Sequence, residues 1–414
     1  MESLTPIARK ITWILFIVQS LASAGFIAAA TLNSIVGAKL SQQAGWAGVP
    51  TAVYLVAGAL SAYLWGYLMD IIGRRGGLTL GLGLGVIGSG LAFLAITGSS
   101  LVLFLAGMIL MGAANAAVQL GRFAAAEVHP PKARGRAISN VVLGGTFGAV
   151  LGPNLVGPIG AWIKPISGDE LAGAYAVSLT LFLIGMVTVY LGVRPDPRDV
   201  GRQVSEAYPE LVRPAVEVRR LSEILLQPGA LTAVIAMAFG QMVMVLVMVI
   251  TSLHMRDHDH GLGDISIVIS SHTFGMYAFS ILSGRFSDRF GRGPVIIAGS
   301  ATLVLSCIAA TFSPSVLPLG VALFLLGLGW NFCFVAGSAL FADQLSPAER
   351  SRLQGFNDLM VGTSSAIGSL SSGIIFAAVG YNMMAYISAA VAFIPLAVAV
   401  FWTRGNPHKL AVPA

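Results

Sequence analysis

The stretch GYLMDIIGR at residues 66–74 returns as GRFSDRFGR at residues 284–292, 218 positions later in a chain of 414 residues. Both copies have the form G-x-x-x-D-x-x-G-R, and each lies between two long apolar runs. A short charged turn between apolar runs is typical of a hairpin of membrane-spanning helices. Because each half of the chain holds one copy, the sequence predicts a membrane protein built from an internal repeat.

The composition agrees with a membrane location. Hydrophobic residues make up 56% of the chain and charged residues 10%, and the mean hydropathy is +0.83. These values exclude an ordinary soluble globular protein. A span needs about 20 apolar residues. The apolar runs predict twelve spans, at about 11–38, 47–69, 78–97, 101–126, 137–163, 171–193, 229–255, 263–284, 294–312, 316–341, 353–378 and 380–402.

The positive charges predict the orientation. If the N-terminus lies in the cytoplasm, all but three of the 24 Lys and Arg residues fall on the inner side. The exceptions are Lys39, Lys164 and Arg256. The excess of Lys and Arg in cytoplasmic loops then places both termini in the cytoplasm, and we expect an integral protein of the plasma (inner) membrane.

The two halves repeat beyond the hairpin. At an offset of 216 positions, Asn115 aligns with Asn331 and Glu127 with Asp343. We therefore predict an N-terminal six-helix bundle over residues 1–193, a cytoplasmic linker over 194–227 and a C-terminal six-helix bundle over 228–414. Transporter repeats of this kind bind substrate between the bundles, near the middle of the membrane.

The paired hairpin motif resembles the loop motif of the major facilitator superfamily. The resemblance implies an all-α polytopic membrane fold, with 12 transmembrane helices in two pseudo-symmetric six-helix bundles. It also implies a latch of opposite charges that favours one conformation; the alternative is that these charges only set the topology. The latch residues are predicted to be Gly66, Asp70, Gly73, Arg74, Arg75, Glu127 and Arg134, and in the second half Gly284, Asp288, Gly291, Arg292, Asp343 and Arg350.

A second motif lies in the fifth span. Gly148, Gly152, Pro153 and Gly157 resemble the Gly-Pro motif of antiporters in this superfamily, with the last glycine displaced by one position. The resemblance implies antiport. Small residues at four-residue spacing also serve ordinary helix packing, which is the alternative.

The resemblance assigns the substrate cavity to the first, fourth, seventh and tenth spans. Helical periodicity selects one face of each. The cavity residues predicted in this way are Gln19, Phe26, Asn33, Asn115, Gln119, Arg122, Gln241, Met244, Met248, Asn331 and Phe334. These faces mix amide, thioether and aromatic groups with little charge, which suits a weakly polar solute. The alternative is interhelical packing, with Asn115 and Asn331 as symmetric hydrogen-bonding residues.

Few titratable groups fall inside the predicted membrane region. His272 in the eighth span and Asp358 near the inner end of the eleventh are the candidates for proton coupling. The outer turn after the seventh span carries His254, His258 and His260 among three acidic residues. These histidines are weak candidates for a metal site, and a solvated loop or a gate that senses external pH is the favoured interpretation.

The leading hypothesis is a secondary active transporter that exports a small amphiphilic compound by alternating access, with protons as the coupling ion. The alternatives are a metal or metal-chelate transporter and a non-transporting receptor or assembly protein of the same superfamily. The sequence holds no constellation typical of an enzyme, so we expect no catalytic residues. We expect no cofactor, no nucleic-acid partner and a monomer in the lipid bilayer.

Overall fold

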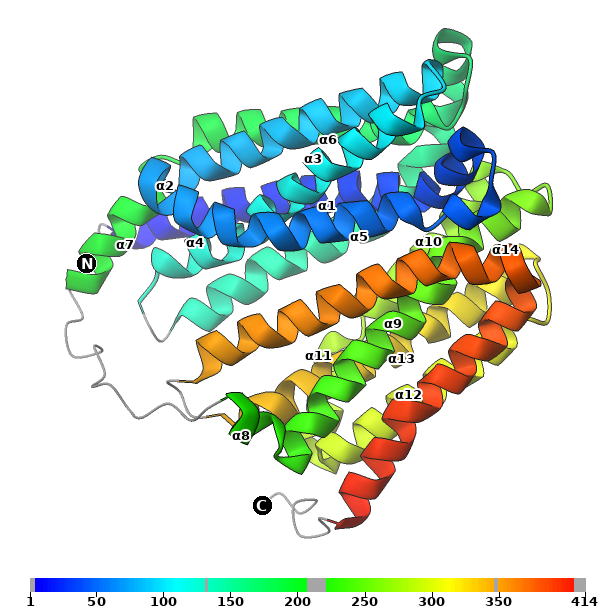
Figure 1. Ribbon diagram of the computed structural model, residues 1–414. Coiled ribbons are helices and arrows are strands. Elements are labelled where there is room, and N and C mark those ends of the chain that lie inside the picture. Colours follow the sequence, from blue (N-terminus) through cyan, green and yellow to red (C-terminus); the bar gives the residue numbers. More distant parts are fainter. Residues whose placement is uncertain (1–3, 131–132, 207–220, 346–348, 406–414) are drawn as a thin grey trace. The chain divides into compact units, whose positions relative to one another are not determined.

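The computed structural model describes residues 4–130, 133–206, 221–345 and 349–405, and all regular structure in this part of the chain is helical (Figure 1). Within these residues, ten helical stretches are long and apolar enough to cross a membrane. Two of them, Ala44–Thr97 and Phe356–Gly405, have 54 and 50 residues, far more than the roughly 20 that one span needs. Each changes direction at a glycine, Gly73 or Gly380. Each therefore supplies two spans, which confirms the predicted twelve.

The contacts between helices divide the chain into two compact units. The first unit contains Met1–Ser41 and Val53–Arg213, and the second contains Gln42–Ala52 and Pro214–Ala414. The segment 42–52 belongs to the second unit because its short 3-10 helix η1 (Ala44–Trp46) packs on α14 (Arg350–Gly405).

In the first unit, α1 is the central helix. It packs against α5, α6, α3 and α4, and it is apolar on most of its circumference, as expected of a helix enclosed by others. The helices of this unit are α1 (Leu4–Ser41), α2 (Val49–Thr97), α3 (Leu101–Gln119), α4 (Gly121–Glu127), α5 (Arg134–Ser167), α6 (Ala172–Gly192) and α7 (Pro197–Glu206).

In the second unit, α9 packs against α13 and α14, and α13 also packs against α10 and α12. Proline at the first position starts α9, where the missing N–H costs no hydrogen bond. Besides α14, the helices are α8 (Leu221–Leu225), α9 (Pro228–Asp257), α10 (Leu262–Tyr277), α11 (Ser280–Phe290), α12 (Arg292–Ala309) and α13 (Val316–Asp343).

The glycine before the arginine in each motif makes the turn of the hairpin. Gly73 has φ 84° and ψ 164°, and Gly291 has φ 90° and ψ 160°. This region of backbone space is open essentially to glycine alone, because a Cβ would collide with the neighbouring carbonyl. The equivalent glycines thus explain why the motif ends one span and begins the next.

Candidate functional site

The motif of the first unit forms a compact group of charges, which we call cluster 1 and which consists of Asp70, Arg74 and Glu127. Arg74 donates from Nη2 to Glu127 Oε1 at 2.6 Å and from Nε to Oε2 at 3.0 Å. Its Nη1 lies 3.0 Å from Asp70 Oδ1. A guanidinium that donates two parallel bonds to one carboxylate is held in a fixed geometry. Cluster 1 therefore joins the turn of α2 to the end of α4.

Asp196 completes the turn, and the sequence analysis missed it. Its Oδ1 accepts the backbone N–H of Arg74 at 3.1 Å, and its Oδ2 accepts that of Arg75 at 3.0 Å. These N–H groups begin the second span of α2, where a helix lacks internal acceptors and favours negative charge. A Cβ on Gly73 would overlap Asp196 Oδ2. The segment after α6 thus caps the second span of α2.

Two further arginines, Arg198 and Arg75, connect the α2 turn to neighbouring helices. Arg198 donates from Nη1 to the carbonyl oxygens of Asp70, at 2.8 Å, and Ile71, at 3.1 Å. Carbonyls at the end of a helix lack internal donors, so a cation there is favourable. Arg75 donates to the Tyr190 carbonyl at 3.1 Å and lies over its ring. The α2 turn is therefore bound to α6 and α7 as well as to α4.

The second unit repeats this arrangement in cluster 2, which consists of Asp288, Arg292 and Asp343. Arg292 Nη1 donates to Asp288 Oδ1 at 2.5 Å, and its Nε donates to Asp343 Oδ2 at 3.1 Å. Asp343 accepts one hydrogen bond from Arg292, whereas Glu127 accepts two parallel hydrogen bonds from Arg74. The side chain of Arg350 lies outside the described residues. Both clusters thus bring predicted latch residues together, and their role as a latch stays a prediction.

Among the described residues, the remaining latch candidates form no ion pair with the two clusters, although Arg134 lines a pocket together with Glu127. Arg134 Nε donates to the backbone carbonyl of His129 at 3.4 Å. Apart from the backbone of their own helix and their chain neighbours, no described atom lies within 4 Å of the place where a Cβ would stand on Gly66 or Gly284. The structure therefore gives these two glycines no packing requirement within the described residues.

The glycines of α5 form a contact face against α1. A Cβ on Gly148 would overlap the carbonyl oxygen of Ser20, and one on Gly152 would overlap that of Ala24. The two helices therefore approach with backbone against backbone, which only small residues permit. Pro153 is buried inside the helix. Gly157 is half-buried, one position beyond this register.

The cavity candidates of the first unit differ in their surroundings. Asn33 is 3% exposed and accepts a hydrogen bond from the hydroxyl of buried Tyr175 at 2.9 Å. Phe26 packs against the ring of Phe182 on α6, with centroids 4.6 Å apart. Gln19 is buried and donates to Ser23 at 3.3 Å. All three thus contact residues of their own unit.

The candidates on α3 and α4 are more open. Asn115 is half-buried and Gln119 is exposed. Neither amide makes a hydrogen bond to a residue that the structure describes. Arg122 lies at the start of α4, with its guanidinium 4.9 Å from the centre of the Phe123 ring. Among the cavity candidates of this unit, Asn115 and Gln119 therefore have amide groups with hydrogen-bonding capacity left for a solute.

In the second unit, Asn331 has the surroundings of a structural residue. It is 1% exposed, and its Nδ2 donates to the Met276 carbonyl at 2.6 Å and to Ser280 at 2.8 Å. Its Oδ1 accepts from the Ser283 hydroxyl. The amide therefore has partners for its donor and acceptor groups and connects α13 to α10 and α11.

Two of the other candidates of this unit, Gln241 and Phe334, contact Trp330. Trp330 donates to Gln241 at 2.6 Å and stacks on Phe334 at a centroid distance of 5.0 Å. Met244 is buried and Met248 is half-buried on α9. The sequence analysis missed Trp330, although it lies one turn before the predicted Phe334 on α13.

The two proton-coupling candidates differ in burial. His272 is fully buried, and its Nδ1 lies 2.9 Å from the carbonyl oxygen of Leu323. Its Nε2 is buried and has no hydrogen-bond partner among the described residues. Asp358 has an exposed side chain.

Two of the three histidines around the end of α9 lie side by side, with the ring centroids of His254 and His258 4.4 Å apart. The His254 ring stacks on Tyr381 at 3.9 Å, and His258 Nδ1 lies 2.8 Å from the His254 carbonyl oxygen. His260 instead lies 3.5 Å from Asp264. Within the described part of the chain, no three His, Cys, Asp or Glu side chains are placed to hold a metal ion.

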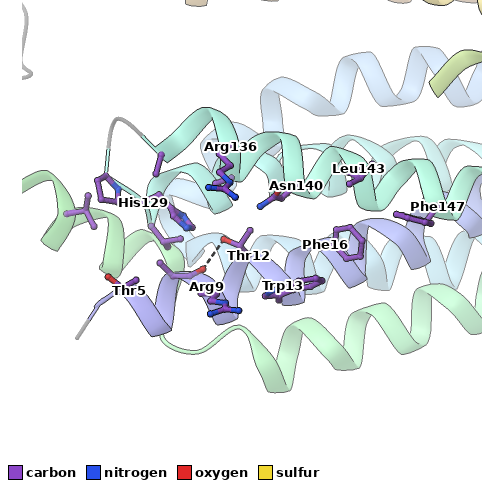
Figure 2. Close-up of a pocket in the computed structure, with 16 residues that line it drawn as sticks. Thr5, Arg9, Thr12, Trp13, Phe16, His129, Arg136, Asn140, Leu143 and Phe147 are labelled. Carbon is purple, nitrogen blue, oxygen red and sulfur yellow. Dashed lines mark hydrogen bonds between the residues drawn. The ribbon is translucent and has the colours of Figure 1, made fainter. Parts of the chain in front are cut away.

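A cavity of about 990 Å³ lies between α1 and α5 in the first unit (Figure 2). The turn after α4 and Val204 of α7 complete its wall. Figure 2 shows Arg9, His129 and Arg136 toward the start of both helices, and Phe16, Leu143 and Phe147 farther along them. The sequence analysis used Arg9 and Arg136 only for orientation and did not bring them together.

Known proteins place the chain in one family. The model of the Major Facilitator Superfamily matches residues 12–262 and 231–414. The chain is similar to YdeG, an uncharacterised MFS-type transporter of Bacillus subtilis, with 32% identity over 96% of this chain and 93% of that protein. It is 29% identical to the riboflavin transporter RfnT of Brucella anthropi, over 94% of this chain and 95% of that protein. It is 24% identical to the multi-drug resistance efflux pump PmrA of Streptococcus pneumoniae, over 86% of each.

A solved structure shows the same fold. A bacterial homologue of the human lysosomal transporter Spinster, crystallised inward-facing and unoccupied, matches 99% of this chain and 100% of its own with a TM-score of 0.73 and 15% identity. Since the family model covers both hairpin motifs, the chain belongs to the major facilitator superfamily, whose members are integral membrane transporters and not enzymes.

Proposed function

We propose that this transporter exports a small amphiphilic compound across the plasma membrane in exchange for protons. In this proposal the two six-helix bundles alternate access to a central site, both termini lie in the cytoplasm and the monomer is the working unit. The distribution of Lys and Arg supports the orientation. The similarity to the efflux pump PmrA supports the direction.

The observation that carries the proposal is the chemistry of the candidate cavity residues. Asn115 and Gln119 in the first unit offer amide groups that are not used within the described part of the protein, and the half-buried Met248 and Phe334 in the second unit offer apolar, polarisable groups. Arg122 is the one charged residue among the predicted cavity residues. Apolar, polarisable groups bind apolar bodies by contact area, and a few amide groups orient them, which suits an amphiphilic solute.

The duplicated clusters support alternating access. Each arginine bridges two carboxylates, one within its own hairpin and one at the end of α4 or α13. Such contacts stabilise one arrangement of helix ends, and a two-state transport cycle requires contacts that hold one state and release in the other.

Proton coupling is assigned to His272. With Nδ1 bonded to the Leu323 carbonyl, the tautomer that donates from Nδ1 leaves Nε2 with its lone pair free. Histidine is the side chain whose ordinary pKa lies nearest the working pH. A proton taken up at Nε2 would therefore leave the bond from Nδ1 to α13 intact.

The test uses proteoliposomes with a pH indicator inside. Lipophilic cations, small anions and divalent metals are added in turn, and the proton flux that each induces is recorded. We expect flux with an amphiphilic compound, lost in His272→Gln, which keeps a hydrogen-bond donor but does not titrate. His258→Gln is the matched control, because this exposed ring also lies against a backbone carbonyl. Substrate movement that is indifferent to a proton gradient would contradict the antiport.

Riboflavin transport is a second candidate. It is favoured by the similarity to RfnT, which covers 94% of this chain at 29% identity, a higher identity than that to PmrA. The same proteoliposomes answer the question when riboflavin fluorescence is followed across the membrane. Riboflavin uptake or release without a response to lipophilic drugs would replace the first candidate with this one.

A further inference from the structure

The cavity between α1 and α5 has one polar end and one apolar end. Arg9, His129 and Arg136 line it where the two helices begin, and Trp13, Phe16 and Phe147 line it farther along (Figure 2). Trp13 is 57% exposed and Phe147 is 56% exposed, so their rings are open to a ligand. A site with this gradient matches a molecule with a charged head and an apolar body.

The charge of the cavity is not balanced. None of the sixteen described residues that line it is acidic. Neither Arg9 nor Arg136 forms an ion pair with a described residue, whereas Arg74 and Arg292 each contact two carboxylates. Two guanidinium groups beside apolar surface are stabilised by an anion that accepts their N–H groups.

The cavity also offers neutral hydrogen-bonding groups beside these arginines. Asn140 follows Arg136 by one helical turn, and Thr5 precedes Arg9 by one. Thr12 is buried and directs its hydroxyl to the carbonyl of Ala8 at 2.9 Å, so it presents its methyl group rather than a free donor. The available donors therefore lie at the same end as the positive charge.

We infer that this cavity is a binding site for an amphiphilic anion. The anionic head contacts Arg9 and Arg136, and the apolar body lies against Trp13, Phe16 and Phe147. Two sources share this chemistry: an anionic phospholipid of the bilayer and a water-soluble amphiphilic anion. Basic pockets between helices at the cytoplasmic face of membrane proteins bind anionic head groups. The inference does not depend on the direction or coupling of transport.

The experiment uses the purified full-length protein in a neutral detergent. Phosphatidylglycerol and phosphatidylethanolamine represent the lipid source with and without net charge, and their retention is measured by native mass spectrometry. Decyl sulfate and decanol represent the soluble source, and their binding is followed by tryptophan fluorescence. The chain has six tryptophans, so Trp13→Phe identifies the part of the signal that comes from the cavity.

The variants separate the cavity from general surface charge. Arg9→Gln and Arg136→Gln remove its positive charges, and the double variant removes both. Lys10→Gln is the matched control, because Lys10 neighbours Arg9 on α1 and carries the same charge but does not line the cavity. Thermal unfolding of each variant verifies that it is folded.

We expect the anionic probe from at least one source to bind more tightly than its neutral counterpart. The double variant should weaken that binding by at least about tenfold, since each lost contact is a charge-assisted hydrogen bond, while Lys10→Gln leaves it within about twofold. The probe that responds identifies the source. The inference is overturned if anionic and neutral probes bind equally, if no probe binds, or if Lys10→Gln weakens binding as much as Arg9→Gln.

Discussion

Arg74 and Glu127, 53 positions apart in the chain, are joined by parallel hydrogen bonds of 2.6 and 3.0 Å. The pair lies at the end of α4 and at the turn between the two spans of α2. The Arg74 side chain is 20% exposed and that of Glu127 is 32% exposed. Water therefore screens this pair less than it screens the 67% exposed Asp70, which shares the same arginine. This difference makes the two carboxylates of cluster 1 separable by experiment.

Glu127→Gln should lower the free energy of unfolding by about 1–2 kcal/mol, because it replaces charge-assisted bonds with neutral ones around a half-buried arginine. Asp70→Asn should change it by less than about 0.5 kcal/mol, since an exposed i,i+4 pair contributes little. Thermal unfolding in detergent measures both. Equal effects of the two variants would show that the parallel hydrogen bonds to Glu127 contribute no more stability than the exposed pair with Asp70.

Gly73→Ala should destabilise the protein by about 1–3 kcal/mol, because the backbone at φ 84° and ψ 164° excludes a side chain and a Cβ would overlap Asp196. Gly66→Ala is the matched control from the same motif. It lies within a helix with open space around it, so alanine should be neutral or stabilise by up to about 1 kcal/mol. A tolerated Gly73→Ala would mean that the turn has another available geometry.

The contact between α5 and α1 gives a third prediction. Gly148→Ala should destabilise by more than about 2 kcal/mol, because the new methyl group would overlap the Ser20 backbone carbonyl, which cannot rotate away. Gly145→Ala should destabilise the protein less. The atom nearest to its new Cβ is the Ser23 hydroxyl oxygen at 3.1 Å, which belongs to a side chain that can move.

The unfolding midpoint of each glycine variant should be measured together with its transport rate. If Gly148→Ala unfolds like the wild type but loses transport, this face serves motion rather than packing, and the antiporter interpretation of the motif gains support.

The spans were predictable because a bilayer imposes length and apolarity on each of them. The run predicted to begin at residue 380 does so where the backbone of Gly380 turns. The gathering of Arg74, Asp70 and Glu127 was also predictable, since all three lie at predicted helix ends on the same side. Glycines and charged residues at helix ends therefore allow the turns between spans and the grouping of charges to be predicted from the sequence.

The partners of individual polar groups were not predictable. Periodicity places Asn33 on a helix face, but only the path of α6 brings Tyr175 to it. Asp196 caps the α2 turn because the chain returns there after α6, and no local pattern marks it. Arg9 and Arg136 line one cavity because α1 packs against α5. Each of these contacts depends on how helices distant in sequence pack.

The aligned asparagines provide the last prediction, since the sequence left open whether both are structural. Asn331→Ala should destabilise by about 2–4 kcal/mol, because it leaves the buried groups of Met276, Ser280 and Ser283 without the amide that they contact. Asn115→Ala should change stability by less than about 0.5 kcal/mol, since the half-buried amide has no hydrogen bond to a described residue.

The KM for transport should change in Asn115→Ala rather than in Asn331→Ala, which reverses the order expected for stability. If Asn115 contacts the solute, its alanine variant raises KM by about tenfold at unchanged stability, as measured in proteoliposomes with the compound found to move. Asn331→Ala should reduce the amount of folded protein while leaving the KM of the folded fraction near that of the wild type. A large stability loss in Asn115→Ala would instead make both residues structural, because two repeats that fold alike would then use their asparagines alike.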